Sequence, residues 1–186
     1  MSLDVAALEP QNSGTREFLA RSQRRMLIDN EWVAAASGRA FDTLNPATGA
    51  VLGQVPAGDA EDVDRAVAAA RRAFESPAWR DMVPAQRARL LWKMADLIEA
   101  HLDELAELET LDQGKPVCVG RYAEIPGAIE QFRYFAGQAM RIEGTTIPTS
   151  INYQPAGKQL FAYTSKQPIG VVGAIVPWNF PLIMAA

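Results

Sequence analysis

The sequence is most constrained by one apolar run near its carboxyl end. Residues 169–186 contain one clearly polar side chain, that of Asn179, inside the Pro-Trp-Asn-Phe-Pro stretch at 177–181. A proline fixes its own φ and pushes the preceding residue out of the helical region, so Val176 and Phe180 are predicted to be extended. We therefore predict an apolar strand that ends in a stiff loop, which would hold the amide side chain in one direction.

The run is short and flanked by glycine and proline, which is typical of a central parallel strand covered by helices on both faces. The loop after such a strand lies at the edge where open α/β sheets bind ligands. A membrane span is the alternative, because eighteen apolar residues are near the minimum for crossing a bilayer. Two prolines and the glycines Gly170 and Gly173 interrupt the run, so we predict no membrane contact. The Gly-x-x-Gly spacing alone is weak evidence for a nucleotide site.

Signals for short strands and a helix precede this run. Residues 1–24 have no sustained apolar period, so a mobile tail or a short helix is expected there. Apolar and polar residues alternate over 26–55 around turn-forming residues, which predicts short strands. Asp59 is predicted to cap a helix, with Glu61 and Asp62 near the positive end of its dipole.

Two further helices and a hairpin are predicted. One helix begins near Pro84, and its leucine-rich stripe continues to a stop at Gly114. A third occupies about 121–140, where an internal Pro-Gly pair predicts a kink or a late start. Two extended segments follow, the second over 158–166, and together they predict a projecting hairpin.

Composition excludes several classes of partner. The 186 residues are 48% hydrophobic and 22% charged, which is typical of a globular chain. A net charge of −4 and a pI near 5.1 give no general attraction to nucleic acid or anionic lipid. One cysteine cannot form an internal disulfide framework, and the opening residues lack the features of a signal peptide. We therefore predict no nucleic-acid partner and a reducing, cytoplasmic compartment.

The thiol and the imidazole of this chain do not predict a catalytic centre. Cys118 follows a Gly-Lys-Pro helix break, and we predict a buried or partly buried structural thiol there rather than a nucleophile. His101 lies among acidic residues on a leucine-rich helix, which predicts a solvated position. With no second histidine or cysteine at suitable spacing, neither a metal site nor a serine-histidine hydrolase is predicted.

The stretch at 177–181 resembles the Pro-Trp-Asn-Phe-Pro signature of the aldehyde dehydrogenase superfamily. Five other segments resemble pieces of that family in the same order, namely 26–32, 45–49, 59–63, 114–116 and 135–137. The resemblance covers most of the chain. It implies an α/β fold, the amino-terminal part of a Rossmann-like coenzyme-binding domain, with short strands, several helices and a projecting β-hairpin arm.

The resemblance also implies an organisation along the chain. We expect a mobile tail at 1–24, the amino-terminal part of the coenzyme-binding domain at 25–146 and an oligomerisation hairpin arm at 147–167. The first strand of the Rossmann-like sheet and the asparagine loop are expected at 168–186. In the family, the nucleophilic cysteine and the general-base glutamate lie far downstream of this loop. We therefore expect a truncated fragment that is inactive alone, and a homo-oligomer, dimer or tetramer, for the complete protein.

The chemistry implied by the resemblance is the oxidation of an aldehyde to its acid through a cysteine thiohemiacetal and a thioester. Asn179 would donate to the oxyanion that forms on the aldehyde oxygen. The stretch Ile175, Val176, Pro177, Trp178 and Asn179 would line a nicotinamide cofactor, NAD or NADP, with NAD favoured. Only the oxyanion donor of this mechanism would be present among these residues.

Two questions stay open at this level. A non-catalytic alternative is an assembly or binding module that uses the 158–166 strand to join the sheet edge of another subunit. Substrate is the second question. The runs 108–115 and 168–172 look most like the phenylacetaldehyde and related aryl-aldehyde branch of the family, with betaine-type aldehyde dehydrogenases next.

Overall fold

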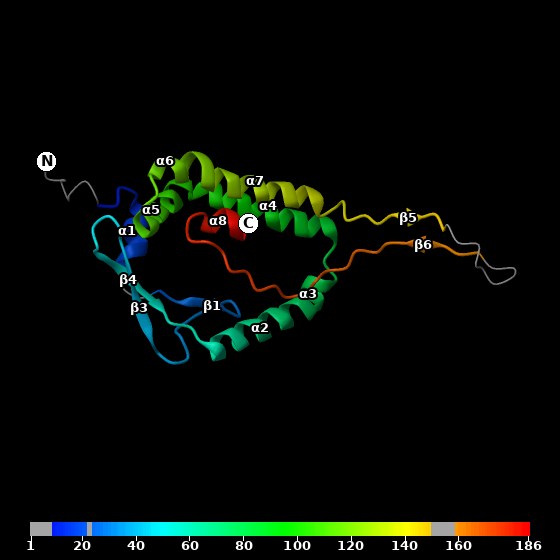
Figure 1. The fold of residues 1–186 in the computed structure, drawn as a ribbon, viewed down its shortest axis with the longest axis horizontal. Coiled ribbons are helices and arrows are strands. Elements are labelled where there is room, and N and C mark those ends of the chain that lie inside the picture. Colours follow the sequence, from blue (N-terminus) through cyan, green and yellow to red (C-terminus); the bar gives the residue numbers. More distant parts are fainter. Residues whose placement is uncertain (1–8, 22–23, 150–158) are drawn as a thin grey trace.

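The structure, a computed structural model, describes residues 9–21, 24–149 and 159–186 (Figure 1). The strands are β1 Met26–Ile28, β2 Glu31–Val33, β3 Ala40–Leu44, β4 Val51–Pro56, β5 Thr146–Ile147 and β6 Ala162–Tyr163. The helices are α1 Ser13–Ala20, α2 Ala60–Glu75, α3 Pro77–Arg80, α4 Pro84–Ala100, α5 Leu102–Gln113, α6 Val117–Val119, the π-helical turn η2 Gly120–Glu124, α7 Ile125–Gln138 and α8 Pro181–Ala185. The structure therefore has the mixture of helices and short strands that the sequence predicted.

The two amino-terminal hairpins confirm the short strands predicted over 26–55. Strand β1 pairs with β2 and β3 pairs with β4, both antiparallel. Asp29 and Asn30 form the first turn with φ values of 54° and 62°, a left-handed conformation that asparagine and aspartate tolerate better than most residues. The turn after β3 is closed by the Asn45 side chain, which accepts a hydrogen bond from the amide of Ala47 at 2.9 Å.

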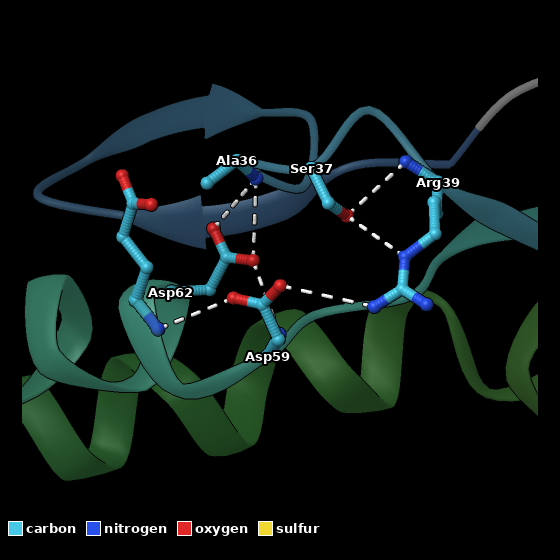
Figure 2. Close-up of polar contacts among 6 residues, drawn as sticks. Ala36, Ser37, Arg39, Asp59 and Asp62 are labelled. Atoms are coloured by element: carbon cyan, nitrogen blue, oxygen red, sulfur yellow. Dashed lines mark hydrogen bonds and ion pairs between the residues drawn. The ribbon is translucent and has the colours of Figure 1, made fainter.

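Helix α2 begins where the sequence predicted, with Asp59 as its N-cap. The Asp59 carboxylate accepts from the amide of Glu61, and the Asp62 carboxylate accepts from the amide of Asp59, which completes a capping box. Figure 2 shows a second role of Asp62 that the sequence did not predict. Its two oxygens lie 3.0 and 3.2 Å from the amide nitrogen of Ala36, so this buried carboxylate joins the helix start to the chain after β2.

Replacing Asp62 with alanine is expected to loosen this junction by about 1–3 kcal/mol, because the amides of Ala36 and Asp59 lose their acceptor. The local measurement is hydrogen exchange over residues 34–40, which should accelerate about tenfold or more. Asp64→Ala, at an exposed position of the same helix, is the matched control. Equal exchange rates in the two variants would contradict the role given to Asp62.

Four helical segments form the main core. Helix α4 packs along α7, and α5 and η2 close the end of the pair (Figure 1). The buried centre consists of Ala95, Ala106, Ile125 and Ile129, with Ile98, Leu102, Leu105, Phe132 and Leu182 around it. Among the described residues, no helix has both the length and the apolar character that crossing a bilayer requires.

The leucine stripe predicted from Pro84 to Gly114 belongs to two helices instead of one. The chain leaves helical geometry at His101, with φ −109° and ψ 19°, and this residue ends α4 and begins α5. The break lets Ile98 before it and Leu102 after it pack against one core. Gly114 ends α5 as predicted, in the left-handed conformation with φ 80°.

The third predicted helix starts earlier than position 121. Helical structure begins at Val117 and runs through the π-helical turn η2 into α7. Pro126 lies in the first turn of α7, where its missing N–H costs little. The irregularity predicted from the Pro-Gly pair is therefore confirmed, but it takes the form of a π turn before the proline instead of a late start.

The segment 1–24 is not wholly a tail. Residues 13–20 form α1, capped by the Asn12 side chain, which accepts from the amides of Gly14 and Thr15. The helix contacts α5, Thr15 is fully buried, and the amide of Asn12 donates to Glu107 at 3.0 Å. Of the two alternatives for this segment, the short helix is confirmed over 13–20, where contacts distant in sequence hold a helix too short to form alone. Residues 1–8 and 22–23 lie outside the described part.

The projecting hairpin predicted from the sequence is confirmed. Strands β5 and β6 pair antiparallel and extend away from the helices (Figure 1). Gly144 lies at the base of the arm, where an added Cβ would collide with the backbone of Thr164. The two segments of the arm therefore approach each other closely at this point. Residues 150–158, within the arm predicted at 147–167, lie outside the described part.

The start of 168–186 differs from the predicted strand. Residues 168–177 have no strand pairing in the structure, and most of their side chains are exposed. A β-strand forms only when its amides and carbonyls pair with a neighbouring strand, and the described residues place none beside this segment. The segment crosses between α2 and the α4–α7 pair as unpaired chain and then enters α8 (Figure 1).

Candidate functional site

Asn179 lies in a turn directly before the short helix α8. Phe180 precedes the helix with φ −144° and ψ 57°, which is non-helical, as proline requires, but not the extended conformation that the sequence predicted. Pro181 occupies the first turn, and the carbonyl of Phe180 accepts a hydrogen bond from the amide of Met184 at 3.2 Å. The Asn179 residue is exposed. The loop therefore leaves Asn179 accessible from outside the described residues.

The other predicted cofactor-lining residues form one continuous exposed stretch with Asn179. Ile175, Val176, Pro177 and Trp178 are all exposed, and Trp178 retains 77% of its accessible surface. An open cleft of about 550 Å³ lies further up the chain, between residues 170–172 and the helices α2 and α3. Asn179 does not line that cleft. The structure keeps the predicted residues together but does not enclose them.

A buried charge cluster, Lys115 with Glu109 and Glu124, lies against the asparagine loop and was missed by the sequence analysis. The Lys115 ammonium pairs with Glu109 at 3.3 Å and with Glu124, and it lies 4.2 Å from the centre of the Phe180 ring. The side chains of Lys115, Glu109 and Glu124 are 8%, 11% and 0% exposed. The only sequence signal was the Gly-Lys-Pro segment at 114–116, which we interpreted as a helix break.

The backbone explains why Lys115 points inward. Gly114 reverses the chain at the end of α5 through its left-handed conformation, and its amide donates to the carbonyl of Thr110 at 2.9 Å. Lys115 follows directly and lies next to Glu109 of the helix it has just left. Glu124 comes from the π-helical turn, so two separate elements supply the carboxylates.

The cluster holds two carboxylates and one ammonium in a poorly solvated place. Burial raises the pKa of the Glu109 carboxyl above its usual value, and the charge and hydrogen bond of Lys115 oppose that rise. Because burial is the larger effect, Glu109 accepts a proton more readily in the folded protein than in the unfolded chain.

Substituting Glu109 with glutamine is expected to raise the unfolding temperature more near neutral pH than below about pH 4. A carboxyl with a raised folded-state pKa stabilises the fold most below its unfolded pKa, and this contribution is lost as pH rises through the folded pKa. Glutamine does not titrate and avoids that loss. Thermal unfolding of both proteins across this range is the measurement. A difference that shrinks as pH rises would contradict the assignment.

Two apolar contacts complete the attachment of α8. Leu182 packs against the core cluster of the helical bundle. The tip of Ile183 occupies the space that a Cβ on Gly127 of α7 would fill. Phe180, Leu182 and Ile183 therefore all dock on the bundle, so the asparagine loop is anchored by the residues that follow it.

The two residues that the sequence excluded from catalysis lie on α6 and at the break between α4 and α5. Cys118 is exposed, so the prediction of a buried or partly buried thiol is wrong. Cys118 is the middle residue of α6, which is a single turn. His101 is 59% exposed, as predicted, and its Nδ1 lies 2.9 Å from a carboxylate oxygen of Glu104.

Comparison with known proteins gives the family. A sequence model of the aldehyde dehydrogenase family matches residues 32–186. The chain is 49% identical over 165 residues to the mitochondrial aldehyde dehydrogenase family 2 member B4 of Arabidopsis thaliana, covering 89% of this chain and 29% of that protein. It is 46% identical over 165 residues to the phenylacetaldehyde dehydrogenase of Pseudomonas fluorescens, covering 89% of this chain and 33% of that protein.

Solved structures agree with the sequence comparisons. An NAD⁺ complex of an aldehyde dehydrogenase from Bacillus cereus superimposes with a TM-score of 0.85 at 46% identity, covering 95% of this chain and 34% of that one. The chain spans about a third of the length of the curated relatives it matches. Sequence and fold together show that the chain belongs to the aldehyde dehydrogenase family.

Proposed function

We propose that these residues are the amino-terminal third of an NAD(P)⁺-dependent aldehyde dehydrogenase. The balanced reaction converts an aldehyde, water and NAD(P)⁺ into a carboxylic acid, NAD(P)H and a proton. The observation that carries the proposal is the superposition on an NAD⁺-bound relative over 95% of the chain. The thiohemiacetal and thioester would form on a cysteine outside these residues, as the family resemblance implies for the nucleophile.

The role of Asn179 follows from its chemistry. Its side-chain amide is a neutral donor on a stiff loop, and a donor aimed at the aldehyde oxygen stabilises the negative charge that develops there. Such a donor is most effective when it needs no reorganisation during the reaction. The proline after Phe180 and the docking of α8 limit the freedom of the loop and so support this role.

The stretch 175–178 is proposed to lie along the cofactor. It offers exposed backbone and the apolar side chains of Ile175 and Trp178, which suit contact with a flat, partly apolar ring. Bound NAD(P)⁺ would supply the acceptor for the hydride. NAD is favoured over NADP, because a B. cereus relative with 46% identity binds NAD⁺.

A second candidate function is assembly through the β5–β6 arm. Phe161 and Tyr163 are 74% and 64% exposed, and their rings lie 5.6 Å apart on the arm. Exposed aromatic pairs of this kind are common at subunit contacts. We propose that the arm joins copies of the complete protein into a homo-oligomer, and the cytoplasm stays our predicted compartment.

The substrate is proposed to be an aryl-acetaldehyde, on the resemblance of 108–115 and 168–172 to that branch and on the phenylacetaldehyde dehydrogenase among the relatives. In the complete enzyme, phenylacetaldehyde should give a higher kcat/KM than short aliphatic or quaternary-ammonium aldehydes. A steady-state panel with NAD⁺ and with NADP⁺ tests the reaction and the substrate together. Betaine aldehyde as the best substrate would overturn the substrate class, and no turnover of any aldehyde would overturn the proposed function.

A further inference from the structure

The side chains directly before Asn179 are exposed, whereas those directly after it dock on the helical bundle. Before it, Ile169, Ile175 and Trp178 are among the most exposed apolar residues of the chain. After it, Phe180 and the α8 residues dock on the helical bundle. Within the described residues, the direction of the Asn179 amide therefore depends on contacts made after it.

The first of these contacts joins Phe180 to a cation. The Lys115 ammonium lies 4.2 Å from the centre of the Phe180 ring, within the range of a cation–π interaction. Such interactions are strongest when the cation is desolvated, and the Lys115 side chain is only 8% exposed. Phe180 is covalently next to Asn179, so a shift of the ring displaces the amide.

Lys115 is itself fixed by its surroundings. Glu109 of α5 and Glu124 of the π-helical turn hold the ammonium from two elements. An ammonium is attracted by the face of an aromatic ring. Gly114 sets the backbone direction immediately before it. The Lys115 ammonium is thus held in place by its partners, and the Phe180 ring contacts it.

We propose that Lys115 is a positioning residue, which holds the Phe180 ring and so orients the Asn179 amide toward the aldehyde oxygen. This inference rests on the proposed function. Lys115 acts through Phe180 and not on the reacting atoms, so its loss reduces the rate of hydride transfer and leaves NAD⁺ affinity little changed. A merely structural ion cluster would instead lower the unfolding temperature with no effect on the rate in folded enzyme.

The test uses Lys115→Met, Phe180→Leu and the double variant in the complete enzyme. Lys93→Met, at an exposed lysine on α4, is the control. Single-turnover NADH formation well below the unfolding temperature gives the hydride-transfer rate, and titration gives the Kd for NAD⁺. We expect Lys115→Met and Phe180→Leu each to slow hydride transfer by about 10–100-fold, since small misplacements of a reacting geometry have effects of this size. The Kd should change less than about threefold.

The double variant should be no slower than the slower single variant, because each substitution removes the same contact between Lys115 and Phe180. Lys115→Arg, which keeps the charge, should recover part of the rate. A folded Lys115→Met enzyme with hydride transfer like that of Lys93→Met would overturn the proposal. If Lys115→Met does not fold, the proposal is tested with Phe180→Leu, which leaves the ion cluster intact. An unchanged rate of hydride transfer in Phe180→Leu also overturns the proposal.

Asn179→Ala separates this inference from the function beneath it. Slow hydride transfer in Asn179→Ala with normal rates in Lys115→Met and Phe180→Leu would remove the positioning role alone. Normal hydride transfer in Asn179→Ala would remove the oxyanion role of Asn179, and the positioning role with it.

Discussion

Replacing Asn179 with alanine in the complete enzyme is expected to lower kcat by about 10²–10³, or roughly 2.7–4 kcal/mol of transition-state stabilisation. The Asn179 amide is a neutral donor on a loop restricted by two prolines, which suits stabilisation of an oxyanion. Pre-steady-state NADH formation is the measurement, because it reports hydride transfer even where product release limits turnover. The affinity for NAD⁺ should change much less than the rate.

Asn179→Asp is the sharper variant. Aspartate has nearly the same size as asparagine and stabilises turns as well, but near neutral pH it has no donor to offer an oxyanion. If Asn179 acts as a donor, the aspartate variant should be at least as slow as the alanine variant. Hydride transfer within a few-fold of wild type in Asn179→Asp would reduce Asn179 to a turn residue.

The 186-residue polypeptide produced by itself is expected to oxidise no aldehyde and to self-associate. Its asparagine loop is open, and the stretch 169–178 exposes Ile169, Ile175 and Trp178 without a sheet to cover them. NADH formation with a broad panel of aldehydes tests activity, with Cys118→Ala as the control for the one thiol present.

Sedimentation velocity and thermal unfolding test the second part of this expectation. Exposed apolar chain with unpaired amides and carbonyls favours association, so broad, concentration-dependent boundaries should appear. A sharp monomeric boundary together with cooperative unfolding would contradict it. Aldehyde-dependent NADH formation that persists in Cys118→Ala would show that a different nucleophile is present.

The elements that the sequence predicted well are those with local causes. Asp59 begins α2 because its side chain satisfies an amide two residues away, and Gly114 ends α5 because glycine adopts a left-handed conformation easily. The two-residue turn at Asp29 and Asn30 depends equally on its own residues. Each of these signals is complete within a few positions, so the chain does not need its tertiary contacts to specify them.

The elements that were missed depend on distant partners. Helix α1 was only an alternative to a mobile tail, because no apolar period was visible there. In the structure α5 supplies its contacts, and Glu107 accepts from the amides of Gln11 and Asn12 just before it. The break at His101 divides the leucine stripe, which looks continuous in the sequence. Ile98 before the break and Leu102 after it pack against one core. Asp62 looked like a helix-start carboxylate, and its bond to Ala36 needs two elements to meet.

The sequence alone determined the asparagine loop. Two prolines restrict the backbone on either side of Trp178 and Asn179, and that restriction is a property of the residues themselves. The family resemblance, now confirmed, also came from residues in a fixed order. Local steric restrictions depend only on neighbouring residues, so they can be predicted without knowledge of the fold.

Only the tertiary structure decided what holds that loop. Lys115 and Phe180 are far apart in sequence, and their contact requires the turn at Gly114, the two buried carboxylates and the docking of α8. Tertiary structure also left residues 168–177 as unpaired chain, although their pattern is that of a strand. A strand needs a neighbour for its hydrogen bonds, and a buried lysine needs partners for its charge, and neither partner is specified by the residues beside it.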